Sequence, residues 1–237
     1  MVLKVFVLGL PRSATTMLYK RIYKAFKRVG DVIGVFEPTN YEVIDHIMKG
    51  IKHVHDTEGD VPYDYHRLPK ELLDMIYENA KWHLDWTTQE SPKTPFLGGR
   101  LQLILDTLDT IPFPVVLKDV HMWVIADRLV SRYRHAKFIF TSPDLDTYIA
   151  KMKKRYGLVK NPLDKAGIGK FLRFFSNNLY SKTNNEESMI FEATAVWSLY
   201  QVILSNLREF PNVRVLSFRD RIPDSDVYAV IRWCLGG

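Results

Sequence analysis

The chain has 237 residues, 46% of them hydrophobic, so it is long enough to bury the core of one domain. Its 33 lysine and arginine residues exceed its 27 aspartate and glutamate residues, and the formal net charge of +6 favours an anionic partner such as a nucleotide, a nucleic acid or an acidic membrane surface. The one cysteine, Cys234, excludes an intrachain disulfide and a cysteine metal site. Basic residues cluster only at 151–155, which is typical of a solvated helix face, so we expect no nucleic-acid partner.

Residues 2–9 form a near-continuous apolar run, which is typical of a parallel strand buried on both faces. Apolar side chains then recur at helical spacing from 15 to 29, and Gly30 ends that pattern. The apolar segment 5–10 is too short to span a bilayer and shows no cleavage pattern. We therefore expect a cytoplasmic protein with no transmembrane segment, folded as a single domain over residues 1–237.

Strand and helix patterns alternate along the rest of the chain. The predicted elements are a strand at 32–36 ended by Pro38, helices at 41–52, 70–85 and 100–110, a strand at 115–118, a helix at 126–133 and a strand at 137–140. Such alternation predicts an α/β domain with a parallel sheet, whose ligands bind beyond the carboxyl ends of the strands. The loop-rich segment 155–190 carries clustered aromatic residues and is either a lid over the site or a helix flanked by surface loops.

The turn Gly9–Thr16, between the first strand and the first helix, gathers features that suit a phosphate or sulfate group. Free backbone amides, the positive end of a helix dipole and three hydroxyl groups would face one point. Its spacing is close to the Gly-x4-Gly-Lys-Ser/Thr loop of nucleotide hydrolases, but Ala14 replaces the second glycine and Thr15 replaces the lysine. Arg12 is therefore the expected cation. The alternative is an ordinary strand-to-helix turn with Ser13 as the helix cap.

The segment Pro11–Thr16 resembles the 5′-phosphosulfate loop of the sulfotransferase superfamily, Pro-Arg-Ser-Gly-Thr-Thr, with Ala14 in place of the glycine. Only this motif is specific alone, but further landmarks follow in the family's order along nearly the whole chain. They are Val35–Pro38 after the second strand, Val115–Asp119 and Ala136–Phe140 as the third and fourth strands, and Trp197, Val213–Asp220 and Trp233–Gly236 as the closing helix, strand and helix.

The resemblance implies a three-layer α/β sandwich with a central parallel sheet, the P-loop nucleotide-hydrolase-like fold of sulfotransferases. It also implies an enzyme that moves a sulfuryl group from 3′-phosphoadenosine 5′-phosphosulfate to a hydroxyl group of a small molecule, a sugar or a lipid. The expected donor-binding residues are Pro11, Arg12, Ser13, Ala14, Thr15, Thr16, Ser142 and Lys151. No metal is expected, because the histidine- and acid-containing loop at 53–60 has the composition of an ordinary solvated loop.

Transfer of a sulfuryl group needs charge stabilisation, a general base and in-line placement. Arg12 would stabilise the transferring group, and Lys118 would reach the same leaving group unless it is an ordinary strand-end lysine in solvent. Glu37 is the preferred base, since it resembles the catalytic glutamate of several bacterial-type sulfotransferases. His121 is the rival, because cytosolic members use a histidine in a Lys-x-His pattern, and here the spacing is one residue longer. Asp119 would orient His121 or pair with a neighbouring arginine.

Two features depart from the family's pattern. After the fourth strand, family members use an arginine and a serine to bind the donor's 3′-phosphate, and no arginine stands at the matching positions here. The residues that align with this pair are Ser142 or Pro143 and Ala150 or Lys151, and the cations that would substitute are Lys151, Arg132 or Lys154. The family's C-terminal Arg-Lys-Gly loop has no counterpart before Gly237.

Two other functions stay open at this point. One is a P-loop-fold kinase or other phosphotransferase, which needs a magnesium site and usually a lysine in the loop. The other is a non-catalytic binding protein derived from the same fold, a hypothesis that the altered 3′-phosphate site favours. The acceptor depends on the loops at 53–69, 87–99 and 155–190, so the sequence does not identify it.

Overall fold

The computed structural model describes residues 3–50, 61–88, 99–156 and 186–236. In chain order its elements are β1 (Lys4–Gly9), α1 (Thr15–Val29), β2 (Ile33–Phe36), α2 (Tyr41–Met48), the 3-10 helix η2 (Tyr65–Arg67), α3 (Lys70–Thr88), α4 (Gly99–Thr110), β3 (Val115–Asp119), the 3-10 helix η3 (Met122–Ile125), α5 (Ala126–Arg132), β4 (Lys137–Pro143), α6 (Leu145–Tyr156), α9 (Glu186–Leu207), β5 (Val213–Phe218) and α10 (Asp224–Leu235). Within these ranges no helix combines the length and the apolar character needed to cross a bilayer.

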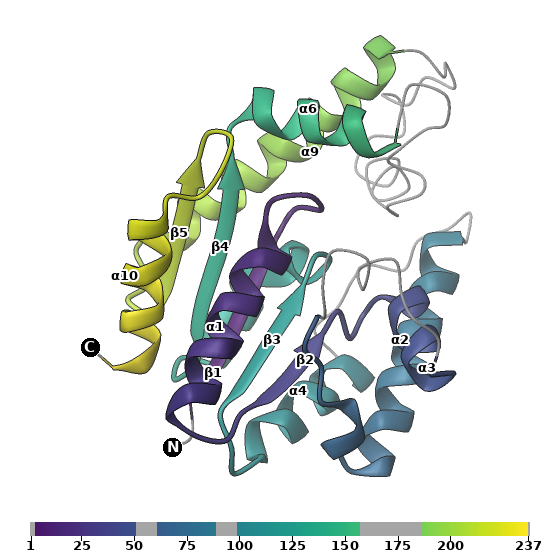
Figure 1. The fold of residues 1–237 in the computed structure, drawn as a ribbon. Helices are drawn as coiled ribbons and strands as arrows, with labels where there is room; N and C mark the ends of the chain where they lie inside the picture. Colours follow the sequence, from purple (N-terminus) through teal and green to yellow (C-terminus); the bar gives the residue numbers. More distant parts are fainter. Residues whose placement is uncertain (1–2, 51–60, 89–98, 157–185, 237) are drawn as a thin grey trace.

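The five strands form one sheet in the order β2-β3-β1-β4-β5, and every neighbouring pair is parallel. β1 therefore lies at the centre of the sheet, with Leu8 opposite Asp119 of β3 and Gly9 opposite Thr141 of β4. Because all strands run the same way, their carboxyl ends meet at one edge, which the arrowheads mark in Figure 1. The loop from β1 into α1 emerges at the middle of this edge.

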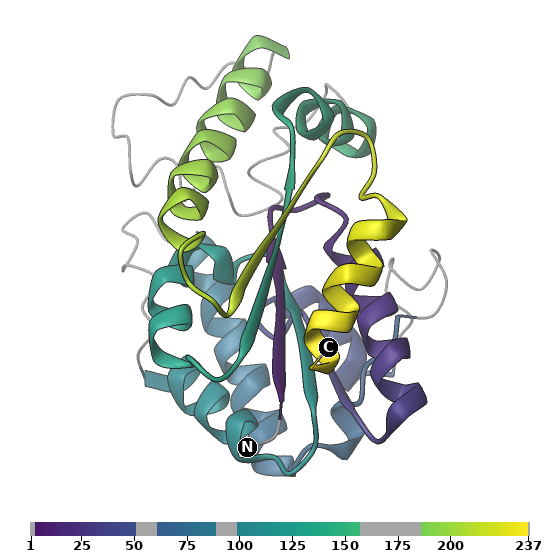
Figure 2. The same ribbon diagram turned by 90° about the vertical axis from the view of Figure 1, so that its left-hand side faces the viewer.

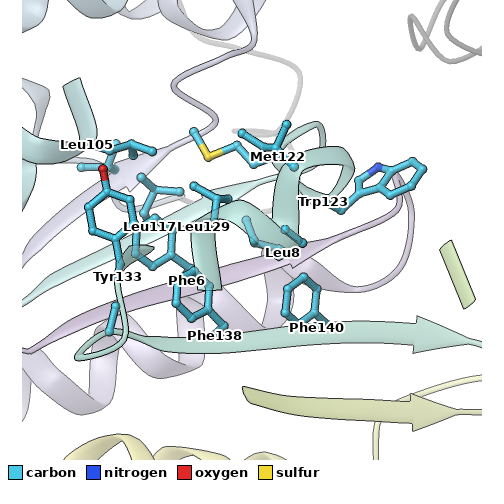
Figure 3. Close-up of a cluster of buried hydrophobic side chains, with 14 of the residues drawn as sticks. Phe6, Leu8, Leu105, Leu117, Met122, Trp123, Leu129, Tyr133, Phe138 and Phe140 are labelled. Atoms are coloured by element: carbon cyan, nitrogen blue, oxygen red, sulfur yellow. The ribbon is translucent and has the colours of Figure 1, made fainter. Parts of the chain in front are cut away.

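Side chains of β1 alternate between two hydrophobic clusters, one on each face of the sheet. Val5 and Val7 pack with α1 and α10, whereas Phe6 and Leu8 pack with α3, α4, α5 and α9. Figure 2 shows the sheet nearly edge-on between these helices, and Figure 3 shows the cluster around Phe6 and Leu8. The predicted three-layer α/β sandwich with a central parallel sheet is therefore confirmed.

Several predicted boundaries differ from the structure. β4 runs on to Pro143, beyond the predicted end at residue 140, because β5 pairs with it up to Phe218. α2 ends at Met48, earlier than the predicted 52. The predicted lid segment 155–190 is helical from residue 186 onward, where α9 begins, and its residues 157–185 lie outside the described part of the chain.

The open side of β2 is hydrogen-bonded by residues of the segment 64–67: Tyr65 donates to the Phe36 carbonyl and Arg67 to the Val32 carbonyl, each at 2.9 Å, and Asp64 bonds Gly34 between them. The Asp64 amide donates to the Gly34 carbonyl at 2.9 Å, and the Gly34 amide donates to Asp64 Oδ2 at 2.7 Å. Tyr23 of α1 donates to the same carboxylate oxygen at 3.0 Å. Both backbone hydrogen-bonding groups of Gly34 on this side of the sheet are therefore satisfied within the domain.

Candidate functional site

The loop between β1 and α1 has an unusual backbone. Arg12 and Ala14 both have positive φ, of 65° and 66°, in the left-handed region that side chains other than glycine rarely adopt. Ala14 is the residue that caps α1, without a side-chain hydrogen bond, and the first helical bond runs from the Leu18 amide to the Ala14 carbonyl. The alternative interpretation of Ser13 as the helix cap is therefore wrong. The amides of the first turn of α1 have no partner of their own in the helix, which suits an anion.

Ser13 is fully buried and folds the loop. Its hydroxyl donates to the Leu10 carbonyl at 2.6 Å, and its amide donates to the same oxygen at 3.2 Å. Because that hydroxyl has one proton, the second contact at 2.7 Å must be a bond donated by Thr141 Oγ1 of β4. The expected Ser13 hydroxyl donor for an anion is therefore used inside the protein, and the remaining loop hydroxyls are those of Thr15, which is buried, and Thr16, which is partly exposed.

Gly9, the last residue of β1, allows this close approach of the loop to β4. A Cβ atom at Gly9 would lie 2.5 Å from Thr141 Oγ1 and 2.7 Å from Ser13 Oγ. Real Cβ atoms essentially never come so close to another heavy atom, so glycine is required here on steric grounds. The glycine of the predicted motif thus serves to fold the loop against the neighbouring strand.

Two cations, Arg12 in the loop and Lys151 on α6, lie within electrostatic range of one another. Arg12 is partly exposed and forms no ion pair with another described residue. Lys151 of α6 lies with its ammonium 4.8 Å from the centre of the Phe218 ring. Burial lowers the pKa of Lys151 and the charge of Arg12 lowers it further, whereas Asp220 and Asp144 oppose the shift. Lys151 therefore lies close enough to Arg12 for their charges to interact, in a region that also holds the carboxylates of Asp220 and Asp144.

The other expected substitutes for the family's arginine are placed differently. Arg132 ends α5, which runs back to the amino edge of the sheet, and its guanidinium binds both carboxylate oxygens of Asp106 at 2.7 and 3.2 Å. It therefore does not reach the loop. Lys154 is exposed on α6, three residues beyond Lys151. Of the three candidates, Lys151 is the one on which the charge of Arg12 acts.

Ser142 lies beside α9 rather than beside the loop. It is buried, and its hydroxyl accepts a hydrogen bond from Gln201 Nε2 at 2.9 Å. Two further side chains of α9 donate hydrogen bonds to the end of β4. The Tyr200 hydroxyl donates to the Thr141 carbonyl at 3.0 Å, and Trp197 Nε1 donates to the Pro143 carbonyl at 2.8 Å. Sequence reasoning missed this support, because nothing near Gln201 in the sequence indicates its distant partner.

Glu37 and Lys118 form a buried ion pair at the carboxyl ends of β2 and β3. Both side chains are at most 3% exposed, and the Lys118 ammonium contacts Glu37 Oε1 and lies 4.6 Å from the centre of the Phe36 ring. Asn40 donates to the second carboxylate oxygen at 2.6 Å. Glu37 itself has a positive φ of 50°, and its amide donates to the Lys118 carbonyl. The interpretation of Lys118 as a lysine in solvent is therefore wrong.

Asp119 and His121 lie next to this pair, in the connection from β3 to η3. Asp119 is fully buried, and its Oδ1 accepts from the amides of His121 and Met122 at 2.7 and 3.0 Å. Its Oδ2 accepts from the amide and the hydroxyl of Thr39 at 3.2 and 2.7 Å. His121 is 27% exposed, and its Nδ1 lies 3.2 Å from Thr39 Oγ1 and 4.0 Å from Asp119 Oδ1.

The described ranges of the chain contain no group of three or more histidine, cysteine, aspartate or glutamate side chains placed to hold a metal ion. Cys234 is buried in α10, and burial raises its pKa to about 12. The histidine- and acid-containing segment 53–60 lies outside the described residues.

Three features described above lie together at the carboxyl edge of the sheet. They are the loop between β1 and α1, the ion pair of Glu37 and Lys118, and His121.

No protein-family model matches the sequence, and no curated protein matches it. The solved structures that resemble the chain include two that match it over nearly its full length. An uncharacterized protein from Eubacterium ventriosum has a TM-score of 0.44 at 10% identity, with 100% of this chain and 99% of that chain covered. The full-length tRNA isopentenylpyrophosphate transferase from Bacillus halodurans has a TM-score of 0.42 at 12% identity, with 99% of this chain and 96% of that chain covered.

Proposed function

We propose that this protein is a sulfotransferase that moves a sulfuryl group from 3′-phosphoadenosine 5′-phosphosulfate to a hydroxyl group of a small molecule, a sugar or a lipid. The observation that carries the proposal is the loop 10–14, in which two left-handed residues lead into the open amino terminus of α1. Arg12 and Lys151 add two positive charges that lie close enough to interact. The resemblance of Pro11–Thr16 to the phosphosulfate loop of the family supports the same assignment.

The charge at this edge suits the donor, which is anionic at both ends. Backbone amides of the first turn of α1 would bind the 5′-phosphosulfate, with Arg12 stabilising the charge that develops on the leaving group. Lys151 would take the place of the missing family arginine toward the 3′-phosphate. A lysine binds phosphate as a point charge without the bidentate geometry of arginine, so we expect weaker selection for the 3′-phosphate than an arginine would give.

His121 is the base that the geometry favours over Glu37. Both oxygens of the Glu37 carboxylate accept hydrogen bonds, from Lys118 and Asn40, and the side chain is 3% exposed. The His121 ring is nine times more exposed and lies at the same edge of the sheet. Lys118 is 2% exposed in the same ion pair, so in this proposal Glu37 and Lys118 shape the carboxyl edge of the sheet rather than contact the donor.

A P-loop phosphotransferase is the competing function. It would need a carboxylate for the magnesium shell, and in P-loop nucleotide hydrolases an aspartate provides it. Asp119, at the end of the strand beside β1, is the acid nearest to that role, but its two oxygens already accept four hydrogen bonds from this chain. Because these hydrogen bonds occupy both oxygens of Asp119, we favour the sulfuryl donor over a magnesium nucleotide as the ligand.

Calorimetric titration separates these functions. We expect adenosine 3′,5′-bisphosphate to bind the wild-type protein, and Arg12→Ala and Lys151→Ala each to weaken binding about 10-fold or more, the effect of losing one charge-assisted hydrogen bond. Arg21→Ala is the matched control, because Arg21 lies on α1 but pairs with Asp224 on the outer surface. Its affinity should equal that of the wild type.

Absence of any binding at millimolar bisphosphate would refute the donor assignment. Tight binding of ATP that depends on Mg²⁺, with none of the bisphosphate, would favour the phosphotransferase. Binding of the bisphosphate with full biological activity in Arg12→Ala, Glu37→Gln and His121→Ala variants would instead favour a non-catalytic binding protein.

A further inference from the structure

The contacts around Asp119 fix where the proton of a neighbouring side chain must lie. Asp119 is fully buried and accepts four hydrogen bonds, two from backbone amides of the β3–η3 connection and two from Thr39. A carboxylate offers about four acceptor sites on its two oxygens, and these four donors match them. The 2.7 Å contact with Thr39 Oγ1 is accordingly a hydrogen bond that Thr39 donates to Asp119 Oδ2.

This assignment decides the second contact of the same hydroxyl. Thr39 Oγ1 has one proton, and that proton is directed at Asp119. The 3.2 Å contact between Thr39 Oγ1 and His121 Nδ1 can then be a hydrogen bond only if Nδ1 carries the proton and donates it to the hydroxyl oxygen. Asp119 itself lies 4.0 Å from Nδ1, too far for a direct hydrogen bond, so Thr39 is the intermediate.

We propose that Thr39 and Asp119 are positioning residues that hold the proton of neutral His121 on Nδ1 and so leave Nε2 as the atom that accepts a proton. The tautomer follows from the contacts alone, whereas its catalytic use rests on the proposed function. In that reaction Nε2 takes the proton of the acceptor hydroxyl while the hydroxyl oxygen bonds to sulfur. The bond from sulfur to the bridging phosphate oxygen breaks, and the electron pair leaves with adenosine 3′,5′-bisphosphate.

Nuclear magnetic resonance of the full chain with ¹⁵N-labelled histidine tests the tautomer directly. Long-range ¹H–¹⁵N correlation at a pH where the imidazole is neutral distinguishes an Nδ1–H ring from an Nε2–H ring. The His121 signals are identified by their loss in His121→Gln, since the chain has seven histidines. We expect Nδ1–H in the wild type, although free histidine prefers Nε2–H.

Two variants of Thr39, the residue between Asp119 and His121, complete the test. Thr39→Val removes the hydroxyl and keeps the side-chain shape, so His121 should revert to Nε2–H. Thr39→Ser keeps the hydroxyl, so it should retain Nδ1–H. A wild-type ring in the Nε2–H form would overturn the proposal by itself, even if Thr39→Val does not fold. An unchanged Nδ1–H ring in folded Thr39→Val would also overturn it.

The result is separable from the donor assignment. We expect Thr39→Val to bind adenosine 3′,5′-bisphosphate as the wild type does, because Thr39 lies in the β2–α2 connection and contacts Asp119 and His121. If the wild type has the Nδ1–H ring but binds no bisphosphate, the positioning role stands and the sulfotransferase function falls. If the bisphosphate binds and the ring is Nε2–H, the function stands and the positioning role falls.

Discussion

Ser13 Oγ and Thr141 Oγ1 lie 2.7 Å apart in the core, which joins the loop after β1 to the adjacent strand β4 through a pair of hydroxyl groups. The two residues are 128 positions apart in the sequence. Both are fully buried. The shape of the loop therefore depends on long-range packing as well as on its own residues.

Gly9→Ala should destabilise the protein, because the added methyl group would lie 2.5 Å from Thr141 Oγ1. We expect a loss of about 1–3 kcal/mol in the free energy of unfolding, the usual effect of overpacking a core. Urea denaturation measures it. Gly30→Ala is the control, since a Cβ there meets nothing within 4 Å. It should change stability by less than about 0.5 kcal/mol, and equal losses in the two variants would contradict this account.

Ala14→Gly should stabilise the protein. An L-residue in the left-handed region costs about 1–2 kcal/mol, and the extra freedom of glycine in the unfolded chain offsets roughly 0.5–1 kcal/mol of that gain. We expect a net increase of about 0.5 kcal/mol or more in the free energy of unfolding. Ala25→Gly, within the same helix, should instead lose about 1 kcal/mol. Equal losses of stability in Ala14→Gly and Ala25→Gly would contradict the assignment of backbone strain to Ala14.

The ion pair of Glu37 and Lys118 should behave as a coupled unit. Glu37→Gln or Lys118→Met alone leaves a buried polar or charged partner, so each should cost about 3–5 kcal/mol. The double variant should cost clearly less than the sum of the two, as a double-mutant cycle in urea would show. Lys49→Met, which breaks the exposed pair with Asp45, is the comparison and should have a much smaller effect. Additive losses would mean that the pair is not coupled.

Stability should fall at alkaline pH, partly through Cys234. Burial raises the pKa of this thiol from 9.0 to about 12, so the unfolded chain loses its proton at a lower pH than the folded one. The stabilisation of the folded protein by the buried neutral thiol is therefore fully present below pH 9.0 and is lost as pH rises toward 12. Between these pH values we expect the thiol to lower the free energy of unfolding by about 1.4 kcal/mol per pH unit. Unfolding measured from pH 8 to 11 should show a shallower decline in Cys234→Ala, and an identical decline would count against the assignment.

Local sequence patterns predicted the elements whose limits depend on local residues. α1 spans Thr15–Val29 as predicted, because its apolar stripe begins after the loop and Gly30 follows its last turn. β4 was predicted too short, since Ser142 and Pro143 are strand through pairing with Ser217 and Phe218 of β5. Hydrogen bonds to a strand about 75 residues later leave no trace in the periodicity of the earlier one.

The candidate site was predictable as a set of residues but not as a set of contacts. Strand ends in an α/β fold pointed to Glu37, Lys118 and His121, and all three lie at the carboxyl edge of the sheet. Residue types did not reveal that Glu37 and Lys118 bind one another across 81 positions. Thr39 was missed as well, because a threonine after Phe-Glu-Pro has no distinctive spacing.

Asp64 helps to protect the edge strand β2 from pairing with another polypeptide. The outermost strand of an open sheet normally offers its backbone to any passing polypeptide and can start aggregation. At β2 the amide and the carboxylate of Asp64 already occupy both groups of Gly34 on that side. Tyr65 and Arg67 bond the neighbouring carbonyls of Phe36 and Val32. A foreign strand would have to displace these residues before it could extend the sheet, so the segment 64–67 protects this edge from self-association.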